Sequence, residues 1–357
     1  MRISAERMPD DHTAPGPLTR QAAAVRMMGS PFVARVLEAS ARQLHRAPRT
    51  AALFAAWPRD AASDALAMRL NAALHALALR GTLPALTAFY AAQGGDADRV
   101  IGDALAATDA FIADWMRETP QTNEVGRAAA IMAALMTLRG QYDMPCELRE
   151  LGCSAGLNLN LARYAYDLGG VAAGDPASPV RIAPDWRGVP VAPRAVDIAS
   201  ARGVDLHPLD ARDDTACERL MAHVWADQPD RAERLARALA IARAAPPAVD
   251  RGDIAGWLPG QLAAPQRDGL CRVVVHSMAL QYLEAGDRRI VEDLIATHGR
   301  YATATRPFAR IAFEWTPARD AVHLTLTAWP DGRVHHLAIC HAYGAWIDWH
   351  GADTNTR

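Results

Sequence analysis

Residues 149–158, which read RELGCSAGLN, constrain the fold more than any other part of the chain. A short apolar run precedes them at 146–151, and an amphipathic run continues to about residue 169. The pattern predicts a β-strand, a tight turn at Gly152 and Gly156, and then a helix. Glycine has no Cβ, and a helix begins with free N–H groups. Such a turn is therefore suited to bind a polar or anionic group.

Three kinds of site fit parts of this turn. The first is a nucleotide-binding loop, but the turn lacks both the G-x-G-x-x-G spacing of dinucleotide-binding loops and the G-K-[ST] ending of phosphate-binding loops. Residues 152–156 match G-x-S-x-G, the turn that presents the nucleophilic serine of α/β-hydrolases, with Ser154 in that position. Glu150, followed by Gly152 and Gly156, matches the acidic-Gly-x-x-x-Gly loop of class I S-adenosylmethionine (SAM) methyltransferases. A strand-to-helix turn without a ligand is the remaining interpretation.

The hydrophobic periodicity changes once along the chain. Residues 1–17 are polar and contain proline, and we expect them to be disordered. From 18 to 142 the apolar residues recur at helical spacing, with a helix stop at Gly81. Residues 143–350 contain strand-like runs separated by helical ones. The sequence therefore predicts an all-α N-terminal region, acting as a lid on the substrate side, followed by a Rossmann-like SAM-binding domain.

The second part of the chain contains seven strand-like runs. They are predicted at 147–151, 195–206, 248–251, 272–276, 310–315, 322–328 and 334–341. Helical runs between the earlier ones predict a doubly wound, mostly parallel sheet with helices on both faces. These helices are predicted at 157–168, 215–244 and 287–304. The last two strands should form an antiparallel hairpin, because only residues 329–333, with an Asp-Gly pair, separate them. The Pro- and Gly-rich residues 169–194 are predicted as an insertion containing a hairpin through 180–182 and 189–191.

Composition and charge exclude several functional classes. The 357 residues include 38 Lys and Arg against 40 Asp and Glu, so nothing indicates a nucleic acid or a membrane surface as partner. The five cysteines are scattered without C-x-x-C pairs, and no H-E-x-x-H or comparable spacing indicates a metal site. No apolar run is long enough to span a membrane and no signal segment is recognisable, so we expect a cytoplasmic protein.

Candidate site residues follow the predicted strands, because ligands of open parallel sheets bind at the carboxyl ends of the strands. Asp205 follows the second strand and is placed to accept from ribose hydroxyls, although helix capping is an equally common role. Asp253 follows the third strand and is a candidate for binding the adenine amino group, or a turn residue. His276 ends the fourth strand as a candidate general base or a structural histidine, with Tyr282 close behind it. Glu314 ends the fifth strand and is expected to face the same pocket.

A dense polar segment, PQTNEVGR at 120–127, lies between two predicted helices immediately before the first strand. A helix N-cap is one interpretation of it. A helix cap, however, uses fewer polar side chains than the four present in this segment, so we expect a binding role. The candidate substrate-binding residues are Gln121, Asn123, Glu124 and Arg127.

The chain resembles the bacterial family catalogued as domain of unknown function 2332 over about residues 21–349, and seven segments carry the resemblance. The segments are PQTNEVGR (120–127), LRELGCSAGLNLNL (148–161), RYAYD (163–167), GVDLHPLD (203–210), RGD (251–253), HSMALQYL (276–283) and residues 341–349. Members of that family resemble class I SAM methyltransferases in the glycine loop, the acid after the second strand and the strand order. Ser154 stands where the commoner G-x-G-x-G loop has its middle glycine.

The resemblance implies a SAM-dependent methyltransferase, with a seven-stranded sheet of class I type ending in the antiparallel hairpin. SAM would be the cofactor. The residues expected to bind it are Glu150, Gly152, Ser154, Gly156, Asn158, Asp205 and Asp253. His276, Tyr282 and Glu314 would contribute to catalysis. No metal is expected.

We expect the methyl acceptor to be a small molecule rather than a nucleic acid, because a large helical region and an insertion would enclose the site. The sequence indicates neither the acceptor nor the oligomeric state. A SAM- or nucleotide-binding protein without catalysis is one alternative. A serine hydrolase using Ser154 is another, although no strands are predicted upstream of its turn. An NAD-dependent oxidoreductase is disfavoured because its glycine fingerprint is missing.

Overall fold

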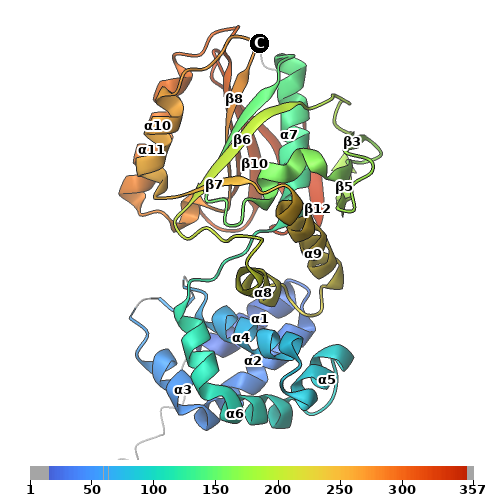
Figure 1. Ribbon diagram of the computed structural model, residues 1–357, viewed down its shortest axis with the longest axis vertical. Coiled ribbons are helices and arrows are strands. Elements are labelled where there is room, and N and C mark those ends of the chain that lie inside the picture. Colours follow the sequence, from blue (N-terminus) through green and yellow to red (C-terminus); the bar gives the residue numbers. More distant parts are fainter. Residues whose placement is uncertain (1–15, 59, 63, 352–357) are drawn as a thin grey trace, which may run out of the picture. The chain divides into compact units, whose positions relative to one another are not determined.

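The computed structural model describes residues 16–58, 60–62 and 64–351 (Figure 1). The disorder expected for residues 1–17 therefore falls almost entirely outside the described residues. The chain forms two compact units. The first comprises Met1–Pro120 and Ala222–Pro229, and the second Gln121–Met221 and Asp230–Arg357.

The described residues of the first unit form helices and no strands, as the periodicity predicts. The helices are α1 (Pro17–Met27), α2 (Pro31–Gln43), η1 (Leu44–Arg46), α3 (Pro48–Ala55), α4 (Leu66–Arg80), α5 (Pro84–Ala92) and α6 (Ala97–Arg117). Four of them, α1, α2, α3 and α5, begin with proline, whose fixed φ suits the first helical turn. The predicted stop after α4 is confirmed: Gly81 adopts the left-handed conformation there, with φ +68°.

The second unit is built on a nine-stranded mixed sheet, ordered β5-β12-β11-β10-β9-β8-β1-β6-β7. Its strands are β1 (Cys146–Leu151), β5 (Asp185–Gly188), β6 (Ile198–Asp205), β7 (Ala248–Arg251), β8 (Cys271–Ser277), β9 (Phe308–Trp315), β10 (Val322–Trp329), β11 (Arg333–Cys340) and β12 (Trp346–Trp349). Neighbours from β7 to β9 are parallel, β9 to β12 form an antiparallel meander, and β5 adds parallel to β12. All seven predicted strands exist, but β5 and β12 extend the sheet beyond the seven strands expected.

Two local predictions for the segment after β1 are wrong. The expected helix at 157–168 is a short 3-10 helix, η3 (Leu157–Arg163), followed by β2 (Ala165–Asp167). The hydroxyls of Tyr164 and Tyr166 donate to the carbonyls of Leu157 and Leu161, which an α-helix would use for its own N–H groups.

The second wrong prediction concerns the insertion at 169–194, which forms no hairpin. There, β3 (Ala172–Gly174) and β4 (Arg181–Ile182) flank β2 in a separate three-stranded sheet, while β5 joins the main sheet.

Helices cover both faces of the main sheet, as predicted, with α7 (Ala128–Gln141) on one side and α10 (Ile254–Ala263) and α11 (Ala285–Gly299) on the other (Figure 1). Two more helices, α8 (Asp214–Ala222) and α9 (Pro229–Ala244), replace the single run predicted at 215–244. Leu151 and Val274 lie in one apolar cluster with residues of α10 and α11. Because strand side chains alternate, Glu150 and Val275 point to the opposite face, toward α7.

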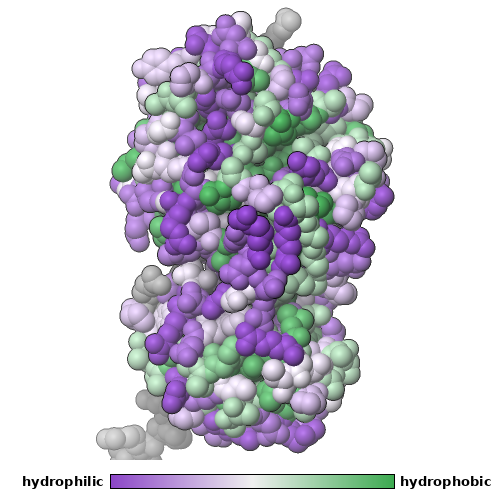
Figure 2. Space-filling view, viewed as in Figure 1, coloured by the Kyte–Doolittle hydropathy of each residue, from purple (hydrophilic) through white to green (hydrophobic). Residues whose placement is uncertain are grey.

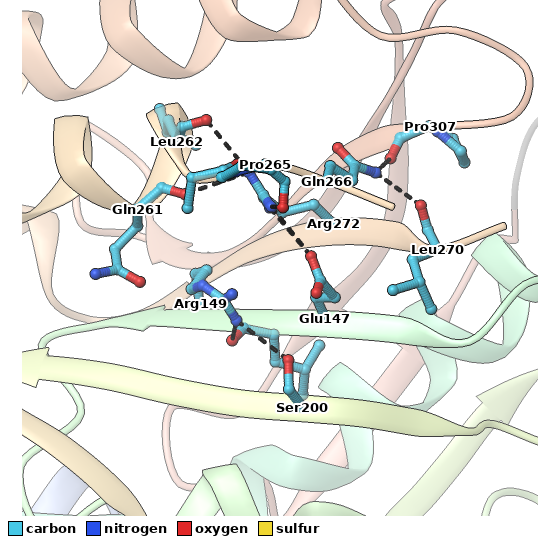
Figure 3. Close-up of polar contacts among 12 residues, drawn as sticks. Glu147, Arg149, Ser200, Gln261, Leu262, Pro265, Gln266, Leu270, Arg272 and Pro307 are labelled. Atoms are coloured by element: carbon cyan, nitrogen blue, oxygen red, sulfur yellow. Dashed lines mark hydrogen bonds and ion pairs between the residues drawn. The ribbon is translucent and has the colours of Figure 1, made fainter. Parts of the chain in front are cut away.

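Arg272, at the start of β8, ties the end of α10 to the sheet (Figure 3). Its guanidinium is 1% exposed and donates to four backbone carbonyls at 2.9–3.3 Å. These belong to Gln261, Leu262, Ala264 and Pro265. It also pairs with Glu147 of β1 at 3.2 Å, so one buried charge satisfies the carbonyls at the helix end and a carboxylate.

Hydrophilic and hydrophobic residues are interspersed on the face drawn in Figure 2, in keeping with the balanced charge. No helix in the described part of the chain is both long and apolar enough to cross a membrane.

Arg272→Met should destabilise the second unit by about 3–5 kcal/mol, because it leaves Glu147 and several carbonyls buried without a donor. Urea unfolding, followed by circular dichroism, measures this loss. Arg306→Met is the control: Arg306 pairs with Asp268, but both side chains are at least half exposed, so a cost of about 0.5 kcal/mol or less is expected. Equal losses in the two variants would contradict the structural role of Arg272.

Candidate functional site

The order of the parallel strands reverses at β1: β6 and β7 lie on one side of it, β8 and β9 on the other. Sheets of this kind bind ligands at the carboxyl ends of the two strands that flank such a reversal. Here these are the ends of β1 and β8, followed by Gly152 and Met278. The two segments are in close contact, since a Cβ on Gly152 would lie 2.6 Å from the Cβ of Ala279.

The turn after β1 has three residues in the left-handed region: Gly152 (φ +69°), Ser154 (φ +54°) and Gly156 (φ +69°). The sequence suggests that the two glycines leave room for a ligand. Instead, protein atoms fill the space beside both. A Cβ on Gly156 would lie 2.6 Å from Val249 Cγ2, just as one on Gly152 would meet Ala279. The glycines are thus needed for the turn conformation and for close packing within the protein.

Asp205, at the end of β6, holds this turn in place. Its Oδ2 accepts from the Ser154 N–H at 2.8 Å, and its Oδ1 accepts from the His207 N–H at 2.9 Å. Gln121 joins the same network: Nε2 donates to Asp205 Oδ1 at 3.4 Å, and Oε1 accepts from the Ser154 hydroxyl at 2.7 Å. Asp205 remains partly exposed, and Leu206 beside it is 60% exposed.

The polar segment before α7 lies directly against the glycine turn. Asn123 accepts from the Leu157 N–H at 2.9 Å through Oδ1 and so caps η3. Gln121 and Asn123 therefore bind protein groups, one at each end of the turn.

Glu150 is buried under the turn, on the α7 face of the sheet. Burial raises its pKa to about 8; a hydrogen bond from Asn158 opposes the shift and the charge of Asp205 adds to it. The Asn158 side chain is buried too, and its Oδ1 has no hydrogen-bond partner. A carboxyl group with a raised pKa and a buried carbonyl oxygen without a hydrogen-bond partner thus lie together beneath the turn. Unsatisfied polar atoms are uncommon in protein interiors.

Glu124 is the centre of a buried ion-pair cluster. Burial would raise its pKa, but the guanidinium groups of Arg231 and Arg234 on α9 keep it lowered. Its Oε2 accepts from Nε and Nη2 of Arg231 at 2.8 and 2.6 Å, and its Oε1 accepts from the Gly126 N–H at 3.0 Å. Arg231 also stacks over the Tyr343 ring, 3.9 Å from its centroid. Both carboxylate oxygens of Glu124 are therefore engaged by the protein.

Arg127 lies next to this cluster and reaches the end of β8. Its Nε donates to the Ala342 carbonyl at 2.9 Å and its Nη1 to the Ser277 carbonyl at 3.2 Å. The guanidinium lies 5.9 Å from the centroid of the Phe313 ring on β9. Two carbonyls and an aromatic ring thus hold it in one orientation.

His276 and Glu314 do not face the same side of the sheet as Glu150. His276 is paired in register with Leu151, so it points toward α10 and α11, and it is 0% exposed. Its Nδ1 bonds Glu314 at 2.7 Å and its Nε2 accepts from Arg310 at 2.9 Å, so both ring nitrogens are occupied. Burial lowers the pKa of His276. This environment does not fit the general base that the sequence suggests.

Glu314 instead positions the segment after β8. The oxygen that binds His276 also accepts from the N–H groups of Ala279 and Leu280, at 3.1 and 3.2 Å. Ala279 is the residue that packs on Gly152, so the carboxylate of Glu314 fixes one wall of the strand reversal.

The two remaining candidates differ in accessibility. Asp253 caps α10, with Oδ2 accepting from the Gly256 N–H at 2.7 Å, which is the capping alternative noted from the sequence. Tyr282 is 76% exposed in η4 (Leu280–Tyr282) after β8. It belongs, like Leu206 after β6, to the carboxyl edge of the sheet. Both side chains are thus accessible at this edge.

The sequence pattern did not reveal Arg234 or Arg310 as members of these networks. Both belong to regular elements, α9 and β9, in a chain with many arginines, so no local signal distinguishes them.

The chain matches the family described as "Uncharacterized protein conserved in bacteria", DUF2332, over residues 17–349. It belongs to this family. No curated protein and no solved structure shows significant similarity to the chain. Membership in DUF2332 confirms the family expected from the motifs.

The pH dependence of the free energy of unfolding tests whether the pKa of Glu150 is raised in the folded protein. Its folded-state pKa, about 8, lies above the ordinary value of 4.5, so the folded protein keeps a proton that the unfolded chain loses. The free energy of unfolding should therefore fall as pH rises from 4.5 to about 8. The fall contributed by this group is at most about 1.4 kcal/mol per pH unit. Glu150→Gln keeps the neutral form, so its stability advantage over wild type should grow through this window.

Glu284→Gln, at an exposed position in the same unit, is the control and should follow the wild-type profile. An advantage of Glu150→Gln that stays constant from pH 5 to 8 would show that Glu150 is ionised in the folded state.

Proposed function

We propose that the second unit binds SAM and transfers its methyl group to a small-molecule acceptor. The observation that carries this proposal is the Glu-x-Gly-x-Ser-x-Gly turn at the strand reversal, with Asp205 of the neighbouring strand bound to it. Class I methyltransferases, which the motifs resemble, use a turn and an acid in this relation. The strand order supports it in part, because β7-β6-β1-β8-β9 is the parallel half of such a sheet, whereas the meander β10–β12 departs from it.

The side chains around the turn fit the parts of this cofactor. A carboxylate has about four lone-pair sites, so Asp205, with three bonds from the protein, can still accept from a ribose hydroxyl. The exposed Leu206 next to it offers an apolar surface for a purine ring. Glu150 and the unpaired Asn158 Oδ1 are two oxygens suited to an ammonium group, with loss of the Glu150 proton on binding.

SAM, when bound, supplies a methyl group on a positively charged sulfur, which becomes a neutral thioether as an acceptor lone pair forms the new bond to carbon. The protein then has to hold the acceptor in line and exclude water. Ala279, which is held in place by Glu314, is suited to position the acceptor in line with the methyl group. A base is needed only for an acceptor that must lose a proton, and Tyr282 is the exposed candidate.

One observation favours the serine hydrolase: Ser154 has φ +54° in a G-x-S-x-G turn after a strand. Its hydroxyl donates to the amide oxygen of Gln121, however, and an amide does not act as a base at neutral pH. We therefore expect a fluorophosphonate probe to leave Ser154 unlabelled, as measured by mass spectrometry of the tryptic peptides. Labelling that Ser154→Ala abolishes would favour the hydrolase instead.

Calorimetric titration with SAM and with S-adenosylhomocysteine tests the proposed function. Wild-type protein should bind both, and Asp205→Asn should bind them at least about ten-fold more weakly, a change of about 1.4 kcal/mol. The cause is that the Asn amide loses one acceptor and the negative charge.

Asp210→Asn is the matched control, because Asp210 lies five residues further on, is exposed and pairs with Arg212. Its affinity should equal that of the wild type. No binding to wild type would exclude a SAM methyltransferase, whereas binding without methylation of any extract component would favour a non-catalytic SAM-binding protein.

A further inference from the structure

Arg127 is a buried cation without an ion-pair partner among the described residues. Its side chain is 9% exposed, yet it forms no ion pair with any residue that the structure describes. Buried charges in proteins are normally paired, because removing a charge from water costs several kcal/mol when nothing replaces the solvent. Burial accordingly lowers the pKa of the Arg127 guanidinium.

Three carboxyl groups, those of Glu124, Glu314 and Glu150, interact electrostatically with Arg127, but none forms an ion pair with it. The first two are engaged elsewhere. Glu124 binds Arg231 through one oxygen and the Gly126 N–H through the other. One oxygen of Glu314 receives three hydrogen bonds, from His276, Ala279 and Leu280. Neither carboxylate is an ion-pair partner of Arg127, although both influence it electrostatically.

The guanidinium is held so that one of its nitrogens stays available. Nε and Nη1 donate to the carbonyls of Ala342 and Ser277, which leaves Nη2 without an acceptor among the described residues. Among the described residues, the polar side-chain atoms that are buried without a hydrogen-bond partner do not include Arg127 Nη2. This nitrogen therefore keeps some access to solvent. A fixed guanidinium that presents N–H groups in this way suits a carboxylate, whose planar geometry it matches.

Arg127 lies on the side of the strand reversal formed by β8 and β9, because its guanidinium contacts the Ser277 carbonyl at the end of β8 and the Phe313 ring on β9. The residues proposed to bind the cofactor's nucleoside lie on the other side: Asp205 and Leu206 follow β6. In a methyltransferase, the position opposite the nucleoside receives the acceptor.

We propose that Arg127 binds a carboxylate of the methyl acceptor, so that the substrates of this enzyme are small carboxylic acids. The acceptor class rests on the proposed function, whereas the anion-binding role of Arg127 rests on its contacts alone. Glu124, with Arg231 and Arg234, keeps the segment that carries Arg127 in place.

The test uses SAM carrying tritium in its methyl group, full-length protein and a bacterial small-molecule extract divided by anion exchange at pH 7 into retained and unretained fractions. Label transferred to the retained fraction is the expected result. It should fall at least ten-fold with Arg127→Met, while the Kd for SAM stays within two-fold of wild type. Label that enters only the unretained fraction, or no fraction, would overturn the proposal.

Arg139→Met is the matched control, because Arg139 also donates to a backbone carbonyl but lies near the other end of α7, roughly 18 Å away along the helix. Its transfer rate should equal that of the wild type. Titration of the wild type and of Arg127→Met with SAM and with decarboxylated SAM separates the two sources of a carboxylate. If the wild type binds decarboxylated SAM at least ten-fold more weakly than SAM, and Arg127→Met binds the two equally, Arg127 binds the carboxylate of the cofactor and the proposal is overturned. Failure of SAM itself to bind would instead reject the proposed function.

Discussion

The bond between the Asp205 carboxylate and the Ser154 N–H is the interaction on which the site depends. It joins the end of β6 to the turn after β1, and Gln121 and Asn123 then fasten the segment before α7 to the same turn. Three stretches far apart in the sequence are thereby brought together at the strand reversal. Because the bond is charge-assisted, it is stronger than an ordinary hydrogen bond between neutral groups.

The features predicted from sequence are those with strong local signals. All seven expected strands exist, because their runs of apolar residues are short and bounded by turns. Strands β5 and β12 were missed: β5 carries mostly exposed residues, and both have only four, so alternation cannot reveal them. The helix expected after Gly156 failed because tyrosines further along the chain occupy its carbonyls.

The contacts of the candidate site residues could not be predicted from sequence. The segment 120–127, for which a binding role is expected, meets the turn after β1. Sequence alone could not show that His276 points to the face opposite Glu150, since a shift of one residue reverses the direction of a strand side chain. Nor could it show that Glu124 is already paired, because its partners on α9 lie more than a hundred residues away.

The contact between Gly152 and Ala279 has a mechanical consequence. Because Gly152 has no Cβ, the Cβ of Ala279 packs directly against it, which leaves the turn after β1 and the segment after β8 little room to slide past each other. The second segment is in turn bound to the carboxylate of Glu314. His276 bonds this carboxylate, and Arg310 donates to the other ring nitrogen of His276. Separating the turn after β1 from the segment after β8 would have to displace both strands. It would at the same time break the charge-assisted bonds of Glu314. The ligand proposed above would therefore enter by movement at the exposed Leu206 and Tyr282, while the floor of the candidate site stays rigid.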